Sequence, residues 1–248
     1  MDVLDKLIEI LCAERGESVP LLTEEQKPDY FRALCNVRPP LPVTNEFLTL
    51  QDEYLTTTKT QKNIENAENF AYVSEICLHK GDITALQCDA IVNAANSAML
   101  GCFHPLHNCI DNAIHSAAGV QMRLACNDIM KGKQAQNGEV IVTEGYNLPS
   151  KYVFHTVGPI VQECVTEQNK ADLRACYLTS LRKADEMQLR TIAFCCISTG
   201  VFGYPKIAAA QLAVQTVKEY KNRTHSQLKV IFDVFSEQDY AIYKQILG

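Results

Sequence analysis

The sequence predicts an α/β fold in which one sheet lies between layers of helices, preceded by an all-helical segment. From residue 71 onward, short apolar stretches typical of strands alternate with longer amphipathic stretches typical of helices. Such alternation predicts a sheet covered by helices on both faces. Residues 191–197 are almost continuously apolar, as expected of a strand that is buried on both faces.

The first 70 residues are expected to form helices only. Leu4, Leu7, Ile8 and Leu11 have the i, i+3, i+4, i+7 spacing of an amphipathic helix. Prolines then separate two further helices, one from about Pro28 or Asp29 to Val37 and one from about Thr44 to Ala71. The candidate apolar anchors of the last helix are Phe47, Leu48, Leu55 and Ile64. We therefore expect a helical extension over residues 1–70 and one larger domain over residues 71–248.

The larger domain is expected to consist of alternating strands and helices. The predicted strands are residues 72–79, 89–93, 138–145, 151–157, 191–197 and 228–235. The predicted helices are residues 106–118, 120–131, 169–187, 205–222 and 237–247. In sheets of this kind, ligands bind beyond the carboxyl ends of the strands.

Composition limits the classes of function. The chain has 248 residues, of which 47% are hydrophobic and 21% charged, a balance typical of globular proteins. Its net charge is −6 and it contains no run of lysine or arginine, which argues against binding nucleic acid by neutralising phosphates. A phosphate-bearing ligand would then be held by backbone amides.

The eleven cysteines do not suggest a set of disulfides, because their number is odd and several lie in apolar stretches that resemble strands. Free thiols in a reducing cytoplasm fit this pattern better. The N-terminus lacks the basic segment and the cleavage site of a signal peptide. No apolar run approaches the roughly 20 residues that span a bilayer. We expect a cytoplasmic protein without membrane contact.

Residues 101–115, GCFHPLHNCIDNAIH, are the most informative stretch of the chain. Cys102, His107 and Cys109 are a candidate zinc site, because three such ligands leave a fourth position open for water or substrate. His104 is a rival ligand, and chance clustering is the alternative. A helix that begins after Pro105 would place Asp111 and His115 on one face. A lone buried histidine such as His115 is more often structural than functional.

Three further segments lie where predicted strands end and helices begin. The segment Gly81-Asp82-Ile83-Thr84 has two interpretations. It is a turn with a capping side chain, or it provides a carboxylate, that of Asp82, which recognises an exocyclic amine. Asn93 and Asn96 suit ribose hydroxyls, although asparagines at strand ends are often only turn formers. The glycine-containing loop of residues 197–205 precedes a helix and offers backbone amides to a diphosphate.

Together these segments resemble the macrodomain, a family that binds ADP-ribose. The matching blocks are GDIT at 81–84, DAIVNAANS at 89–97, DNAIHSAAG at 111–119, GYNLPSKYVFHTVGP at 145–159 and ISTGVFGYP at 197–205. The stretch after Gly101 departs from the glycine run of many macrodomain hydrolases and is similar to the zinc-dependent subfamily, whose pattern is G-C-F-x-P-x-H-x-C-I-D-N. The resemblance implies a three-layer α/β/α fold with a mixed, mostly parallel sheet.

The same resemblance implies a function and assigns residues to it. It implies a hydrolase that removes mono-ADP-ribose from proteins, with an ester-linked Asp or Glu side chain as the expected point of attachment. One zinc per chain would be held by Cys102, His107 and Cys109, with His104 a variable position. The catalytic candidates are Asp111 and Asn96. The ligand-binding candidates are Asp82, Ile83, Asn93, Asn96, Ser198, Thr199, Gly200, Val201, Phe202, Gly203, Tyr204 and Phe235.

Each candidate has an expected task. Asp82 and the amide of Ile83 would hold adenine, on which Phe235 would stack. Residues 198–204 would hold the diphosphate, and the two asparagines the distal ribose. The family also implies a partner, a lipoylated carrier protein modified by a sirtuin. The alternatives are a non-catalytic reader of ADP-ribose and a deacylase of O-acyl-ADP-ribose.

Overall fold

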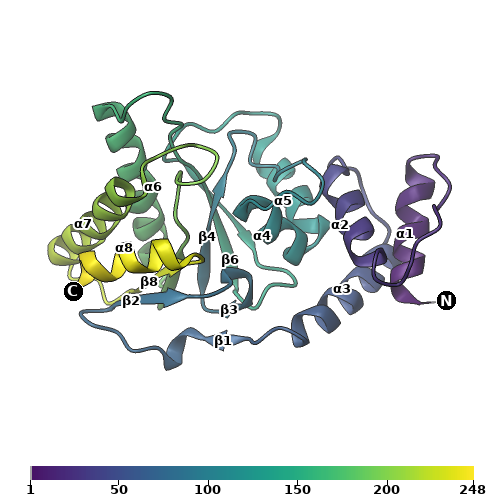
Figure 1. Ribbon diagram of the computed structural model, residues 1–248, viewed down its shortest axis with the longest axis horizontal. Coiled ribbons are helices and arrows are strands. Elements are labelled where there is room, and N and C mark those ends of the chain that lie inside the picture. Colours follow the sequence, from purple (N-terminus) through teal and green to yellow (C-terminus); the bar gives the residue numbers. More distant parts are fainter. Residues whose placement is uncertain (1) are drawn as a thin grey trace.

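The computed structural model describes residues 2–248 and confirms the predicted α/β architecture (Figure 1). Six strands form one sheet in the order β2-β8-β7-β4-β6-β5. They are Ile76–Lys80 (β2), Ala90–Ala95 (β4), Val140–Glu144 (β5), Tyr152–Val157 (β6), Thr191–Phe194 (β7) and Lys229–Val234 (β8). All neighbours pair in parallel except β5, which is antiparallel to β6. The sheet is therefore mixed and mostly parallel, as expected.

Helices cover both faces of this sheet (Figure 1). Helices α6 (Glu167–Glu186), α7 (Lys206–Thr224) and α8 (Glu237–Leu247) lie to one side. Helices α4 (Ile110–Ala118) and α5 (Val120–Met130) lie to the other. The core between the layers contains the fully buried side chains of Tyr177, Phe154, Phe194 and Phe232. The sheet thus buries the apolar side chains of both its faces against helices.

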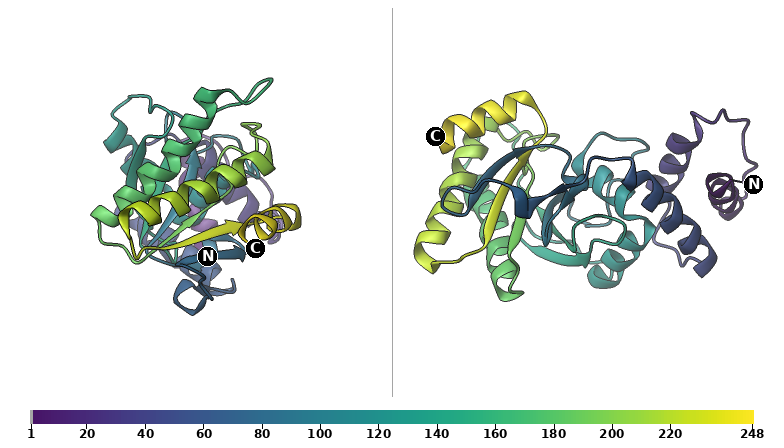
Figure 2. Two further views of the ribbon diagram at one scale, coloured as in Figure 1. Left: turned by 90° about the vertical axis from the view of Figure 1, so that its left-hand side faces the viewer. Right: turned by 90° about the horizontal axis from the view of Figure 1, so that it is seen from below.

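The N-terminal helices form an additional layer beyond α4 and α5 (Figure 2). They span Val3–Glu14 (α1), Lys27–Val37 (α2) and Asn45–Thr60 (α3). The predicted apolar face of α1 is buried in a second core, which also takes in Val120 at the start of α5. Its members are Leu4, Leu7, Ile8, Leu11, Cys12, Phe31, Leu34, Phe47 and Val120. The layer thus packs on the α/β part of the chain through a shared core.

Buried polar contacts reinforce this packing. Gln51 of α3 has no exposed surface. Its side-chain oxygen accepts the backbone N–H of Val120 at 2.9 Å, and its amide nitrogen donates to Gln121 at 2.6 Å. Gly119 approaches Gln51 so closely, at a φ of +99°, that a Cβ there would lie 2.5 Å from Gln51 Nε2. Helix α3 therefore satisfies an amide at the N-terminus of α5 that has no partner within its own helix.

The third N-terminal helix is shorter than expected, because it ends at Thr60 rather than near Ala71. Residues 65–69 instead form a short strand, β1 (Glu65–Asn66), and a 3-10 turn, Ala67–Asn69. Strand β1 pairs in parallel with β3 (Leu86–Gln87), and the Asn66 side chain caps the turn that follows. Ile64 is 36% exposed, so its interpretation as an apolar anchor was wrong.

Two other boundaries differ from the prediction for a local reason. Strand β2 begins at Ile76 rather than residue 72, because Ser74 and Glu75 have positive φ angles of 50° and 60° that no strand accommodates. Helix α4 begins at Ile110 rather than residue 106. Leu106 has a φ of +55°, and the Cys109 sulfur caps the helix by accepting the N–H of Asn112 at 3.4 Å.

The cysteines and the apolar character of the helices complete the description of the fold. All eleven cysteines are free, and six of them are buried. Across residues 2–248, no helix combines the length and the apolar character that crossing a membrane requires.

The shared core predicts a clear difference between two apolar residues of the N-terminal layer. Phe47→Ala should lower the free energy of unfolding by about 3–5 kcal/mol, because it removes a ring buried to 1% exposure. Leu21→Ala is the matched control; Leu21 is fully exposed, and its loss should change stability by less than about 0.5 kcal/mol. Urea denaturation followed by circular dichroism measures both. Equal effects of the two substitutions would contradict the packing described here.

Candidate active site

The carboxyl ends of strands β2, β4, β7 and β8 open into one cavity of about 1170 Å³. Residues from all four segments singled out in the sequence line it, and helices α2, α3 and α4 supply the opposite wall. Parallel strands end at the same edge of a sheet, so residues far apart in the sequence meet there. The cavity is the candidate active site.

Asp82 lies where β2 ends and caps the turn that follows, which is one of the two roles considered for it. Its Oδ1 caps the turn by accepting the backbone N–H of Thr84 at 2.9 Å and the hydroxyl of Thr84 at 2.7 Å. Its Oδ2 accepts a hydrogen bond from the ammonium group of Lys62, at 2.8 Å. Burial alone would raise the pKa of Asp82, but these hydrogen bonds lower it below its usual value. A carboxylate with fixed geometry, able to accept further donors, therefore stands on the cavity wall beside Ile83.

Asp111 lies near the centre of the site and is held by both candidate asparagines. Asn93 donates its side-chain N–H to Asp111 Oδ1 at 2.7 Å, and Asn96 donates to Oδ2 at 3.4 Å. Asn96 faces the cavity, whereas Asn93 is fully buried and does not line it. The structure thus places Asn93 behind Asp111, where it orients the carboxyl group.

Burial changes the acidity of this carboxyl group. Asp111 is 5% exposed, and loss of solvation raises its pKa to about 6, against the opposing effects of the Asn93 hydrogen bond and the Arg123 charge. A carboxyl group that titrates near neutral pH is suited to taking and returning protons. Perturbed acidity of this kind, in a cavity, is characteristic of functional groups.

His115 lies beside Asp111, as the helical spacing predicted. Its Nε2 is 3.6 Å from Asp111 Oδ1, and burial lowers the pKa of His115 well below its usual value, so the ring is neutral. Gly101 crosses directly over this ring with a φ of +81°, and a Cβ there would lie 2.8 Å from His115 Cγ. His115 therefore supports the 101–109 segment from below and fits the structural interpretation.

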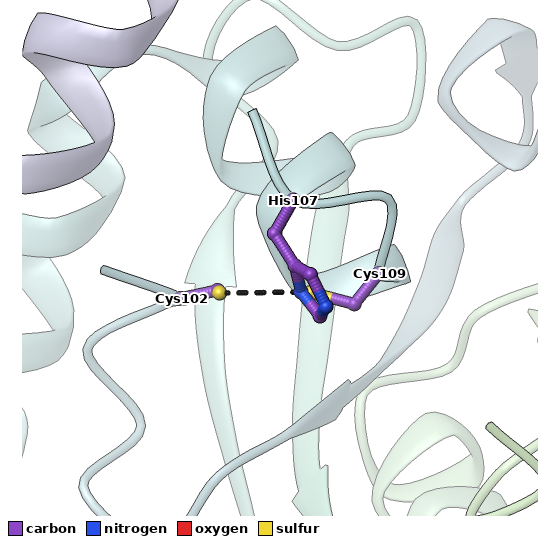
Figure 3. A group of neighbouring side chains, drawn as sticks. All are labelled: Cys102, His107 and Cys109. Atoms are coloured by element: carbon purple, nitrogen blue, oxygen red, sulfur yellow. Dashed lines mark hydrogen bonds between the residues drawn. The ribbon is translucent and has the colours of Figure 1, made fainter. Parts of the chain in front are cut away.

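The structure brings together Cys102, His107 and Cys109 at the cavity (Figure 3). Their ligand atoms lie within 4.8 Å of one another, and Cys102 Sγ is 3.6 Å from His107 Nδ1. A tetrahedral zinc with bonds of about 2.3 Å to sulfur and about 2.0 Å to nitrogen places two such atoms about 3.5 Å apart. The donor set and its spacing therefore fit zinc. His104 is absent from this group and stacks obliquely near His107, with ring centroids 5.9 Å apart.

A second group of possible metal ligands lies deeper in the protein. His115, Cys126 and His155 are all buried, and their ligand atoms also lie within 4.8 Å of one another. Both nitrogens of His155 already have partners, with Nδ1 3.1 Å from Asn93 Nδ2 and Nε2 3.0 Å from Thr143 Oγ1. Burial lowers the pKa of His155 to about 3, so it accepts the Asn93 N–H as a neutral ring. This group therefore fits the support of Asn93 and Asp111 better than metal binding.

The loop after β7 offers backbone amides to the same cavity. Ser198, Thr199, Gly200, Val201 and Phe202 line it, whereas Gly203 and the buried Tyr204 do not. Tyr204 donates its backbone N–H to the carbonyl of Ser198 at 2.9 Å, which closes the loop. In the described residues 2–248, no protein acceptor takes the amides of Gly200, Val201 or Phe202. Free amides just before helix α7 suit an anion.

The far end of the cavity carries an exposed aromatic ring. Phe235 follows strand β8 and is 85% exposed. An aromatic side chain with this exposure at a cavity wall provides a flat surface on which a planar ring can stack.

The sequence analysis did not identify the cavity residues that come from helix α2 and from the segment just after α3. Lys62, Arg32 and Asn36 also line the cavity, and Lys62 binds both Asp82 and Thr84. They belong to no recognisable motif, and their proximity to the site depends on how the helical layer packs.

A family model, curated proteins and solved structures all match this chain. The family model described as Macro domain matches residues 92–213. A protein-ADP-ribose hydrolase of Staphylococcus aureus strain MRSA252 is 44% identical over 250 residues, covering 98% of this chain and 94% of its own length. The chain belongs to the macrodomain family. A protein-ADP-ribose hydrolase of Treponema medium is also 44% identical, over 98% of this chain and 97% of its own.

Two solved structures show the same fold. The Trypanosoma brucei macrodomain in complex with ADP-ribose matches with a TM-score of 0.69 and 29% identity, over 87% of this chain and 95% of its own. The Oceanobacillus iheyensis macrodomain with ADP matches with a TM-score of 0.62 and 38% identity, over 68% of this chain and 88% of its own.

Proposed function

We propose that this macrodomain is a zinc-dependent hydrolase that removes mono-ADP-ribose from proteins, with an ester on an Asp or Glu side chain as its substrate. The activity is supported by relatives named protein-ADP-ribose hydrolase that match nearly the whole chain. The single observation that carries the rest is the geometry of one cavity. It places a buried carboxyl group, Asp111, beside the group of Cys102, His107 and Cys109.

The cavity has a surface suited to each part of ADP-ribose. Asp82 would accept a hydrogen bond from the adenine amino group, and the exposed ring of Phe235 would stack on the base. The free amides of residues 200–202 would hold the diphosphate, in keeping with the chain's net charge of −6. Asn96 would then orient the distal ribose next to Asp111.

The chemistry requires water to attack and a proton to move. Asp111 would accept a proton from the attacking water and return it to the leaving oxygen, which its raised pKa allows near neutral pH. Asn93 and Asn96 keep the two carboxyl oxygens in place during this transfer. When bound by its three ligands, zinc would supply Lewis-acid stabilisation of the negative charge that develops at the scissile bond.

Two alternative functions would use the same cavity. A reader of ADP-ribose would bind the modified protein without cleaving it, so release of free ADP-ribose from an ADP-ribosylated protein separates the two. A deacylase would act on O-acyl-ADP-ribose, and competition between that ester and the modified protein identifies the preferred substrate. The buried, proton-accepting Asp111 favours hydrolysis over binding alone.

Metal content tests the proposed site directly. Purified protein should contain about one zinc per chain by elemental analysis, and Cys102→Ala and His107→Ala should lose both zinc and hydrolysis, because each removes one of three ligands. Cys164→Ala is the control, since Cys164 is exposed and lies outside the cavity. Full activity of metal-free protein would rule out a role for zinc.

Asp111→Ala tests the role of the carboxyl group. Turnover should fall by about 100-fold or more, because a general base typically contributes at least that factor. The Kd for ADP-ribose should change little, since the diphosphate and adenine contacts remain. Steady-state kinetics and calorimetry measure the two quantities. If affinity and turnover fell by the same factor, Asp111 would be a binding residue only.

Asp82→Ala tests adenine recognition with a pair of ligands. Removing the carboxylate should weaken ADP-ribose binding by about 10- to 100-fold, as expected for a hydrogen bond to a charged group. The second ligand is the counterpart of ADP-ribose with hypoxanthine in place of adenine, so that a carbonyl replaces the amine. The variant should bind this ligand no more weakly than the wild type does. Calorimetry with both ligands gives the comparison. Equal losses for the two would show that Asp82 acts by shaping the turn.

A further inference from the structure

Helix α2 makes buried polar contacts with the segment that carries the three ligand candidates. Asn36 is 2% exposed, and its side-chain oxygen accepts the backbone N–H of Leu106 at 3.0 Å. Its amide nitrogen donates to Ser116 Oγ of α4 at 3.0 Å. Leu106 has a φ of +55° and directly precedes His107. Asn36 therefore stabilises the turn that directs the His107 side chain.

Arg32 holds the same turn one helical turn earlier on α2. Its Nη2 donates to the backbone carbonyl of His107 at 3.3 Å and to Asn112 Oδ1 at 2.8 Å. Asn112 is fully buried and donates its own amide to the carbonyl of His104 at 2.9 Å. One guanidinium group thus fixes the backbone at residue 107 directly and at residue 104 through Asn112.

The other end of the segment does not depend on these two α2 side chains. Asn96, just after β4, donates to the carbonyl of Gly101 at 3.0 Å. Arg123 of α5 donates to the carbonyl of Leu100 at 2.7 Å and lies 4.2 Å from the ring centroid of Phe103. Cys102 is therefore placed by the α/β part of the chain. Cys109 begins helix α4 as its cap. The His107 turn is the part of the segment that side chains of α2 hold directly, whereas at the other end α2 and its C-cap contribute only the backbone carbonyls of Cys35 and Arg38, which accept hydrogen bonds from Arg123.

We propose that Arg32 and Asn36 are positioning residues that hold His107 in the geometry of a metal ligand, so that the N-terminal layer is part of the active site. The inference rests on the proposed function, because it takes His107 to bind zinc. Its physical basis is preorganisation: a ligand fixed before the metal arrives loses less conformational entropy on binding. Substitution of a group that orients a metal ligand typically lowers metal affinity by 10- to 100-fold.

The first measurement is zinc affinity in competition with a chromophoric chelator. Arg32→Ala and Asn36→Ala should each raise the Kd for zinc by about 10- to 100-fold. Arg32→Lys keeps the charge but has no planar fork for two acceptors, so it should recover only part of the loss. Lys27→Ala is the control, because Lys27 also lies on α2 but pairs with Asp5 and Glu24, away from the cavity. It should bind zinc like the wild type.

The second measurement uses metal-free protein and needs no activity. Hydrogen exchange of the Leu106 amide should accelerate by about 10-fold or more in Asn36→Ala and Arg32→Ala. The Val120 amide donates a hydrogen bond to Gln51 of α3. Its protection should not change in the variants, which would show that the N-terminal layer still packs on α5. Unchanged zinc affinity and unchanged Leu106 exchange would overturn the proposal. A third outcome separates this inference from the proposed function. If the wild type binds no zinc but the Leu106 amide loses protection in the variants, the proposed zinc dependence is wrong. The contacts of α2 would still be shown to stabilise the turn at Leu106.

Discussion

The burial of the Asp111 carboxyl group is the constraint on which the rest of the site depends. A carboxyl group with so little contact with water needs hydrogen-bond partners. Strand β4 supplies one of them, Asn93, and the residue just after the strand, Asn96, supplies another. Asn93 in turn contacts His155 on the neighbouring strand β6, and His155 contacts Thr143 on β5. This chain of polar contacts fixes helix α4 against three strands. Burial of the carboxyl group also raises its pKa to about 6, although the Asn93 hydrogen bond lowers it, so the position that needs these partners is also the cause of the altered acidity.

The N-terminal layer has a part in this arrangement that its position at the edge of the molecule does not suggest. It shares a core with α5 through Val120, and polar side chains of helix α2 and of the segment just after α3 line the cavity. Lys62 binds the Asp82 carboxylate, while Arg32 and Asn36 contact the segment around His107. The layer therefore closes one wall of the cavity and contacts two of its chemically distinct regions.

Local patterns in the sequence predicted most of the sheet, the helices on its faces and the composition of the site. The reason is geometric: parallel strands end at one edge, so Asp82, Asn96 and Ser198 meet there once the strands are recognised. The pairing of β1 with β3 could not be predicted in this way, because each strand has two residues and the pairing joins distant segments. The burial of Asn93 and the reach of Arg32 depend on tertiary packing, which hydrophobic periodicity does not encode. The start of α4 was misplaced because Leu106 adopts a left-handed conformation rare outside glycine.

The sulfur atom of Cys109 takes part in two features of the site. Cys109 Sγ accepts the amide N–H of Asn112 and so begins α4, and the same atom belongs to the group suited to zinc. A serine at this position would preserve the helix cap, since its hydroxyl accepts the same hydrogen bond, but would replace a soft ligand with a hard one. The start of helix α4 therefore depends on a hydrogen-bond acceptor at residue 109 and not on a sulfur atom. The exchange of one atom at residue 109 would thus remove a candidate zinc ligand and leave the cap of the helix that carries Asp111 intact.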